Sequence, residues 1–425
     1  MNRSGWLAFT FTLVLGGLLP GVGAARPAYD LAPVQAAMRA LVADYRLDGA
    51  SLRLAREGGQ VVMLETFGSY RGDERVAIAS ASKWLSALVL GRLVERGTLA
   101  WDSRVGDYFP EAAPAMRPIT LAQLFSHTAG MDVDDAPCLS VRQTTLQACA
   151  AQILAIPLVY APGTGFAYGG NSMQVAGAMA ERATGEDWDT LFLAEVVQPL
   201  GLTGTDWSTS SLLPGYVPTP NPRIAGGARA TRDDYARVVD MVLATGRHGE
   251  ARYLREDTIA AMAIDRAAGL PVYYAPDGGI GYGYGIGQWV EAKDAAGHTL
   301  RVSSPGAFGF TPWVDWRQGS NGVLLVRGNG SAMRDDLTAI EQLALQQLDF
   351  RRSTQSVPKP ETGGSRPEGS SGIAPARRGP SMAVPADRVE ARTTRRSDRR
   401  PGARPRATRS PGQDAARLDA GRPAL

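Results

Sequence analysis

The chain has 425 residues and a formal charge of +3, but this charge is unevenly distributed. Residues 351–425 hold 17 Lys and Arg against 7 Asp and Glu, which gives +10; subtracting this from the whole-chain value leaves −7 on residues 1–350. The same C-terminal segment is mostly Arg, Pro, Ser, Gly and Ala without hydrophobic periodicity. That composition excludes a buried core and predicts a disordered basic tail, so residues 26–350 are expected to form the folded part.

Residues 1–24 are predicted to be a signal peptide. Arg3 gives a positive start, the stretch from Trp6 to Leu19 is apolar, and small residues precede an expected cleavage after Ala24. An uncleaved membrane anchor is the alternative. The mature protein is therefore expected to be periplasmic or secreted, where nucleic acid is not an expected partner. The cations of the tail could instead contact an anionic surface.

Hydrophobic periodicity divides residues 26–350 into three parts. The first part is a helix over residues 31–45 followed by two strands over residues 50–54 and 60–67. The middle part is mainly helical, and the last part is a series of strands closed by a helix over residues 334–348. The predicted middle helices cover residues 82–95, 120–127, 171–182, 187–197 and 231–243, and the predicted closing strands cover residues 284–290, 299–303, 308–314 and 322–327.

Strands at both ends with helices between them predict an α/β fold, in which both termini build one antiparallel sheet flanked by helices. The middle segment is expected to form an inserted, mostly helical subdomain, and the cleft between the two parts is the expected place for chemistry. Cys138 and Cys149 are eleven positions apart, in what reads as a surface excursion. In an oxidising compartment they are expected to form a disulfide, with two buried free thiols as the alternative.

The chain contains only three lysines, at positions 83, 293 and 359. Lys83 stands three residues after Ser80, at the head of a predicted helix, so the two side chains share one helical face. Arginine supplies nearly all the other positive charge, but it cannot give up its proton, whereas a desolvated lysine can act as a base. The pair therefore predicts a serine nucleophile that is activated without histidine.

Five segments with distinctive sequences follow one another along the folded part. They are Ile78-Ala79-Ser80-Ala81-Ser82-Lys83, residues 97–105, residues 119–131 with Ser126-His127-Thr128-Ala129-Gly130, residues 162–168 ending in Tyr168, and Ser304-Pro305-Gly306-Ala307-Phe308-Gly309. In this order they resemble the serine β-lactamase and penicillin-binding protein superfamily, most closely its esterase-like branch related to class C β-lactamases. The resemblance covers roughly residues 30–350.

The resemblance implies a role for each matching residue. Ser80 is the expected nucleophile, Lys83 accepts its proton or balances charge, and Tyr168 passes a proton to or from the leaving group. The backbone N–H groups of Ser80 and Ala307 are the expected oxyanion hole. Whether Lys83 or Tyr168 takes the serine proton stays open, since a neighbouring ammonium is expected to favour the phenolate form of the tyrosine.

Two motifs depart from the family pattern. Tyr168 is followed by two glycines, so Asn171 comes one position late and is expected to cap the next helix. Ser304 occupies the place of the usual basic residue in the third motif, which favours neutral esters or amides over substrates with a carboxylate. Substrate contacts are expected from Gly170, Asn171, Ser304 and Gly306.

A Ser-His-Asp triad is the main competing constellation, but no Gly-x-Ser-x-Gly segment accompanies the three histidines, His127, His248 and His298. The alternating glycines at positions 281, 283, 285 and 287 predict a strand against which the substrate or a neighbouring helix packs closely. No group of His, Cys, Asp or Glu has metal-ligand spacing, and no cofactor is expected.

The sequence thus predicts an exported serine hydrolase that acts through an acyl-enzyme on a small ester or amide. A β-lactamase or D-amino-acid peptidase is the alternative within the same enzyme class, so a β-lactam is a further substrate to consider. A non-catalytic, cell-wall-binding relative is the alternative from another class, because two of the motifs are altered.

Overall fold

The computed structural model of the chain describes residues 29–133, 136–207 and 219–349. All of them belong to one compact unit, Met1–Lys359. The predicted signal peptide and the basic tail lie outside the described residues. In the described ranges no helix combines the length and apolar character needed to cross a membrane.

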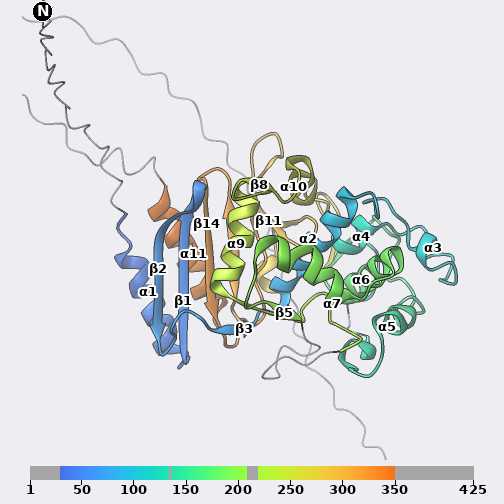
Figure 1. Cartoon of the computed structure of the whole chain (residues 1–425), viewed down its shortest axis with the longest axis horizontal. Coiled ribbons are helices and arrows are strands. Elements are labelled where there is room, and N and C mark those ends of the chain that lie inside the picture. The colour runs from blue at the N-terminus through green and yellow to red at the C-terminus, as the bar shows by residue number, and fades with distance from the viewer. Residues whose placement is uncertain (1–28, 134–135, 208–218, 350–425) are drawn as a thin grey trace, which may run out of the picture. The chain divides into compact units, whose positions relative to one another are not determined.

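Both ends of the described chain contribute to one seven-stranded antiparallel sheet, as the sequence predicts (Figure 1). The N-terminal hairpin joins the C-terminal strands where β1 pairs with β14, Ala50 lying opposite Val326. Nearly every residue of these two strands is buried, including the polar side chains of Ser51, Arg53 and Asn321. The strand order is β10 (Gly283–Tyr284), β11 (Trp289–Lys293), β12 (Thr299–Ser303), β13 (Thr311–Asp315), β14 (Ser320–Val326), β1 (Gly49–Arg56) and β2 (Gln60–Gly68).

Helices cover both faces of this sheet. Because side chains alternate along a strand, Leu324 and Val326 of β14 join one buried cluster and Val323 and Leu325 join another. The first cluster contains α1 (Ala32–Asp44) and α11 (Arg334–Leu348), which contact each other. The second contains α9 (Arg232–Leu243), which packs on β1, β13 and β14. The sheet therefore separates two hydrophobic cores.

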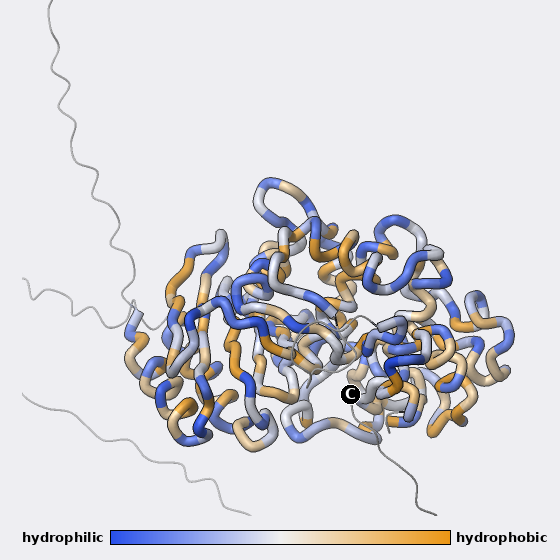
Figure 2. Tube along the Cα trace, turned by 60° about the horizontal axis from the view of Figure 1, so that its bottom comes forward, coloured by the Kyte–Doolittle hydropathy of each residue, from blue (hydrophilic) through white to orange (hydrophobic). Residues whose placement is uncertain are grey.

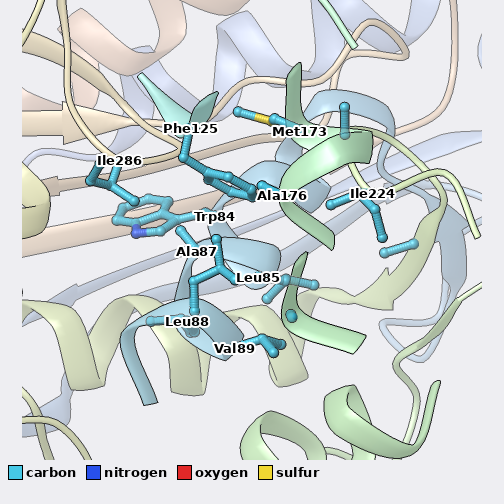
Figure 3. Packing of buried hydrophobic residues seen from close by; sticks show 14 of the residues in the cluster. Trp84, Leu85, Ala87, Leu88, Val89, Phe125, Met173, Ala176, Ile224 and Ile286 are labelled. Atoms are coloured by element: carbon cyan, nitrogen blue, oxygen red, sulfur yellow. The ribbon is translucent and has the colours of Figure 1, made fainter. Parts of the chain in front are cut away.

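The helical part shares the second core. Its centre is α2, whose Trp84, Leu85 and Leu88 are buried in the same cluster as Phe125, and Figure 3 shows Trp84 beside Phe125. Hydrophobic residues recur at intervals along the whole trace, as expected for elements that each turn one side inward (Figure 2). The remaining helices are α2 (Ser82–Glu95), α3 (Val105–Tyr108), α4 (Leu121–Phe125), α5 (Leu146–Ile153), α6 (Asn171–Thr184), α7 (Trp188–Phe192), the π-helical turn Leu193–Val197, α8 (Gln198–Leu200) and α10 (Glu256–Ala263).

The predicted strand over residues 284–290 is wrong, because a turn over residues 285–288 separates β10 from β11. Gly287 in this turn has φ +73°, and a Cβ atom there would lie 2.6 Å from the backbone oxygen of Lys83. The glycines thus allow close packing, as predicted, and at Gly287 the partner is helix α2 rather than a substrate. The strand predicted over residues 308–314 also starts late, at Thr311, because Gly306 N–H donates to Phe310 O and closes a turn.

The disulfide between Cys138 and Cys149 is present, with an S–S distance of 2.07 Å. The expectation that both cysteines lie in a surface excursion is wrong: they are 2% and 0% exposed. They join the short turn Pro137–Ser140 to α5 within the helical core. Three features were not predicted from the sequence: α5, α10 and a small sheet that joins β3 (Arg75–Ala77) to β6 (Ala228–Thr231) and β5 (Asp206–Trp207).

Candidate active site

Ser80 lies on the turn that leads from β3 into α2. The preceding Ala79 has φ +44°, a left-handed conformation that residues with a side chain rarely adopt. Such backbone persists where the surroundings enforce it. Here Ile78 N–H donates to Ala228 O (3.1 Å), and Ala228 N–H donates to Ser82 Oγ (3.0 Å). The small sheet therefore fixes the turn from both sides, while the side chain of Ser80 stays half-buried.

Lys83 reaches back one helical turn to Ser80, as the spacing predicts. Its Nζ donates to Ser80 Oγ at 3.0 Å and to the backbone oxygen of Ala225 at 2.9 Å. The residue is only 4% exposed, so these bonds form away from bulk water and fix the amine beside the hydroxyl.

Tyr168 brings its hydroxyl to the same serine. It follows the short strand β4 (Phe166–Ala167), and the Ser80 side chain is close enough to act on the pKa of its hydroxyl. Burial raises the pKa of Tyr168 to about 12, although the Ser80 side chain opposes this shift. The Lys83 Nζ lies over the face of the tyrosine ring, 4.6 Å from its centroid. Burial thus dominates the pKa of Tyr168, and the neutral phenol is its favoured form at neutral pH.

His127 packs against Tyr168, and among the described residues it makes no hydrogen bond with Ser80. Its ring lies 4.5 Å from the Tyr168 ring, and its Nδ1 accepts a long hydrogen bond from Gly169 N–H at 3.4 Å. Burial and the charge of Lys83 lower the pKa of His127 well below its usual value, so the ring is neutral. Among the described residues its Nε2 has no hydrogen-bond partner. The other two histidines belong to β7 (Arg247–His248) and to an exposed pair with Asp294.

The third motif packs directly on the serine turn. Ser304 Oγ donates to the backbone oxygens of Ser80 (3.3 Å) and Gly287 (3.4 Å), so its hydroxyl holds backbone together. A Cβ atom at Gly306 would lie 2.1 Å from Ile78 O, which shows how closely the two loops approach. Next to it, the Ala307 N–H donates to no acceptor among the described residues. This N–H is available to a substrate oxygen.

Asn171 does not cap α6, and this expectation is wrong. The N-cap is Gly170, and the Asn171 side chain is 1% exposed. Its Oδ1 accepts from Ala136 N–H and its Nδ2 donates to Asp132 O, both at 3.0 Å. The Asn171 amide thus hydrogen-bonds the loop after Met131 to α6. Gly170, the N-cap of α6, lies in the chain between Tyr168 and Asn171.

Two contributors to the site were absent from the sequence prediction. The oxygen of Ala225 anchors Lys83, but any residue offers a carbonyl, so no sequence signal marks it. Trp289 stacks on Tyr168 with ring centroids 5.1 Å apart and an angle of 18° between the planes. Trp289 stands two residues after Gly287, the last of the alternating glycines, and this position was the sequence signal that could have indicated a role in the site. In the described ranges no group of three His, Cys, Asp or Glu side chains is arranged to hold a metal ion.

The fold combines a sheet built from both ends of the described chain with a helical part. The site adds a serine that is hydrogen-bonded to a lysine, with a tyrosine ring beside that lysine. This combination is the β-lactamase type of architecture. The family model described as Beta-lactamase matches residues 34–346, and the chain belongs to this family. The resemblance and the fold class predicted from the sequence are thereby confirmed.

Individual relatives agree with this assignment. A Bacteroides dorei protein described as a candidate β-lactamase is 30% identical, with a TM-score of 0.68 over 76% of this chain and 99% of its own. EstCE1, described as a hydrolase with promiscuous acyltransferase activity, is 21% identical (TM-score 0.61, covering 73% and 97%) and shows the fold alone. Esterase EstB of Burkholderia gladioli is 33% identical over 150 residues, which span 31% of this chain and 38% of the esterase. The chain thus matches well under half of that relative's length.

Proposed function

We propose that this protein is a serine hydrolase that cleaves a small ester or amide through an acyl-enzyme. The observation that carries the proposal is the environment of Ser80 Oγ, which accepts a hydrogen bond from Lys83 Nζ at 3.0 Å, while the same Nζ lies 4.6 Å from the centroid of the Tyr168 ring. The partial match to an esterase and the shared fold of a hydrolase support the same reaction class.

In acylation, Ser80 Oγ attacks the substrate carbonyl carbon while its proton moves to Lys83. The 3.0 Å contact is short enough for this transfer once the amine is neutral. Since the pKa of Tyr168 is about 12, its phenol keeps its proton at neutral pH, and this favours Lys83 over Tyr168 as the first acceptor. The backbone N–H groups of Ser80 and Ala307 then bind the oxyanion.

The next steps release the leaving group and restore the enzyme. When the tetrahedral intermediate collapses, the bond to the leaving group breaks and that group takes a proton from the Tyr168 hydroxyl. The proton held by Lys83 returns the phenol to its neutral form. Water then attacks the acyl-enzyme with the same groups acting in reverse, which releases the acid and regenerates Ser80.

The third motif supports neutral substrates, because Ser304 contributes a backbone-bonded hydroxyl where a cation would bind a carboxylate. One observation favours the second candidate, a β-lactamase or D-amino-acid peptidase. The positive charge of Arg334, at the start of α11, acts on the Tyr168 hydroxyl and opposes the rise of its pKa. An anionic substrate group could therefore be recognised from α11 instead.

The test compares hydrolysis of p-nitrophenyl butyrate and of nitrocefin by the wild type and by Ser80→Ala. Ester turnover that disappears in the variant supports the proposal, and fast nitrocefin turnover favours the second candidate. Lys83→Arg keeps the charge but removes the base, so it should be nearly as damaging as Ser80→Ala. Wild-type rates in Lys83→Arg would exclude the proposed role of the lysine, and a Ser80 that no fluorophosphonate probe labels would favour a non-catalytic relative.

We further propose that the protein is exported. The support is the Cys138–Cys149 disulfide, since such bonds persist in oxidising compartments. Fractionation of cells that express the full chain tests this directly. Recovery of the protein with reduced thiols from the cytoplasm would contradict it.

A further inference from the structure

Residues 265–284 form a long loop whose two ends are hydrogen-bonded to each other and whose middle contacts the candidate active site. At the ends, Arg266 N–H donates to Tyr284 O (2.8 Å) and Tyr284 N–H donates to Asp265 Oδ1 (3.1 Å). In the middle, the strand β9 (Val272–Tyr274) pairs in parallel with β4. Tyr168 N–H donates to Tyr274 O at 3.0 Å, so the backbone of the proposed proton donor and that of the loop are directly joined.

This loop exposes an unusual number of apolar side chains, which we call the apolar rim. Eleven large hydrophobic side chains are exposed in the described part of the chain, and five of them fall between residues 272 and 282. Single exposed hydrophobic residues are normal, but a cluster beside a candidate active site indicates a binding surface. The rim consists of Val272 (63% exposed), Tyr273 (58%), Tyr274 (48%), Ile280 (69%) and Tyr282 (37%).

The strand part of the rim is held in one orientation. Tyr273 stacks on Tyr160 with ring centroids 4.4 Å apart and planes 9° apart, and its ring covers Gly165 so closely that a Cβ there would lie 2.4 Å away. Side chains alternate along a strand, so Tyr274 points to the side opposite Tyr273. There Tyr274 acts electrostatically on the Tyr168 hydroxyl.

The turn part of the rim borders a surface depression that continues toward the third motif. Ile280 and Tyr282 border an open surface depression of about 350 Å³, which they share with Arg334 and with polar side chains that include Asp277, Asp335 and Gln342. Tyr282 and Arg334 also line a neighbouring smaller cavity that reaches Pro305 and Gly306. The strand part of the rim therefore lies beside Tyr168, and Tyr282 of the turn part lies near the predicted oxyanion loop.

We propose that the apolar rim binds the leaving group of the substrate, so that the preferred substrates are esters of medium-chain or aryl alcohols. This inference rests on the proposed function. Tyr168 gives its proton to the leaving-group oxygen, so the alcohol carbon bonded to that oxygen must lie on the tyrosine side of the acyl-enzyme. That side is bordered by Tyr274, whose backbone is bonded to that of Tyr168.

The experiment varies only the alcohol of the substrate. Ethyl, butyl, hexyl and octyl acetate release alcohols of nearly equal acidity, so differences in kcat/KM report binding of the chain rather than leaving-group reactivity. Each methylene that the rim removes from water should raise kcat/KM about fourfold. Tyr274→Ala should lower kcat/KM for octyl acetate about tenfold more than kcat/KM for ethyl acetate, mainly through KM.

Two further variants make the result specific. Ile280→Ser changes a 69% exposed turn residue without disturbing the core and should reduce the same chain-length response. Leu64→Ala, at a 52% exposed position on β2, is the matched control and should change nothing. An unaltered length response in Tyr274→Ala and Ile280→Ser, or an equal loss for all acetates, would overturn the inference while leaving the hydrolase proposal intact.

Three other outcomes would show which part of the proposal is wrong. A length response that follows the acyl chain, measured with ethyl acetate and ethyl octanoate, would overturn the assignment to the leaving group. Altered sedimentation or altered binding to phosphatidylcholine vesicles in Tyr274→Ala, with unchanged kinetics, would assign the rim to a second copy or to a lipid surface. Absence of turnover for every ester by the wild type would overturn the proposed function itself, and the rim assignment with it.

Discussion

Substitution of Gly306 by alanine should test the oxyanion loop without touching any reacting side chain. The added Cβ would lie 2.1 Å from Ile78 O, whereas real Cβ contacts keep at least 3.0 Å. The loop and the serine turn must therefore separate by about 0.9 Å, which moves the Ala307 N–H away from the position of the oxyanion. Loss of one such donor costs about 3 kcal/mol of transition-state stabilisation, a factor of about 100 in kcat/KM.

The assay is kcat/KM for p-nitrophenyl butyrate, together with the thermal midpoint from circular dichroism. Gly226→Ala is the matched control, because its Cβ would contact the same turn at an ordinary 3.8 Å from Ala79, and it should stay within about twofold of the wild type. Gly306→Ala should lower kcat/KM about a hundredfold while Tm changes by only a few degrees. Wild-type kinetics in Gly306→Ala would refute the reasoning, since the loop would then have no role in placing the donor.

Three other predictions concern the buried groups Tyr168, Glu341 and the Cys138–Cys149 disulfide. Because the pKa of Tyr168 is about 12, the wild-type pH–rate profile should show no tyrosine ionisation below about pH 10, and a basic limb near pH 8 that vanishes in Tyr168→Phe would contradict this. Burial raises the pKa of Glu341 well above 4.5, so the folded state keeps a proton that the unfolded state releases. The free energy of unfolding should then fall with rising pH above about 4.5, by up to about 1.4 kcal/mol per pH unit, until the folded-state pKa is passed. Urea unfolding at pH 5 and 8 should show a smaller fall for Glu341→Gln, but not for the exposed control Glu186→Gln. Replacing Cys138 and Cys149 by alanine frees a loop of sequence separation 11 and should cost about 3 kcal/mol in the same assay, whereas a loss below about 0.5 kcal/mol would show that the crosslink does not restrict the unfolded chain.

Local sequence signals were sufficient for several elements. Helices α2 and α11 and the strand β12 lie where the hydrophobic pattern predicts them, and Thr231 caps α9 by accepting from Asp234 N–H. These features depend on contacts within a few residues, such as a cap or one apolar helix face. The prediction over residues 284–290 failed because close packing of Gly287 against α2 imposes a turn there, and nothing within that segment specifies the partner.

The sequence by itself determined the Ser80–Lys83 pair, because a separation of three residues on a helix brings the two side chains together whatever surrounds them. It also determined the order of the family segments and a sheet made from both termini. Only the tertiary structure decided the protonation of Tyr168 and the use of Asn171 as a bridge. Both outcomes depend on burial and on partners that are distant along the chain. For the same reason the position of the apolar rim depends on the pairing of β9 with β4 beside Tyr168, which the sequence of residues 272–282 does not specify.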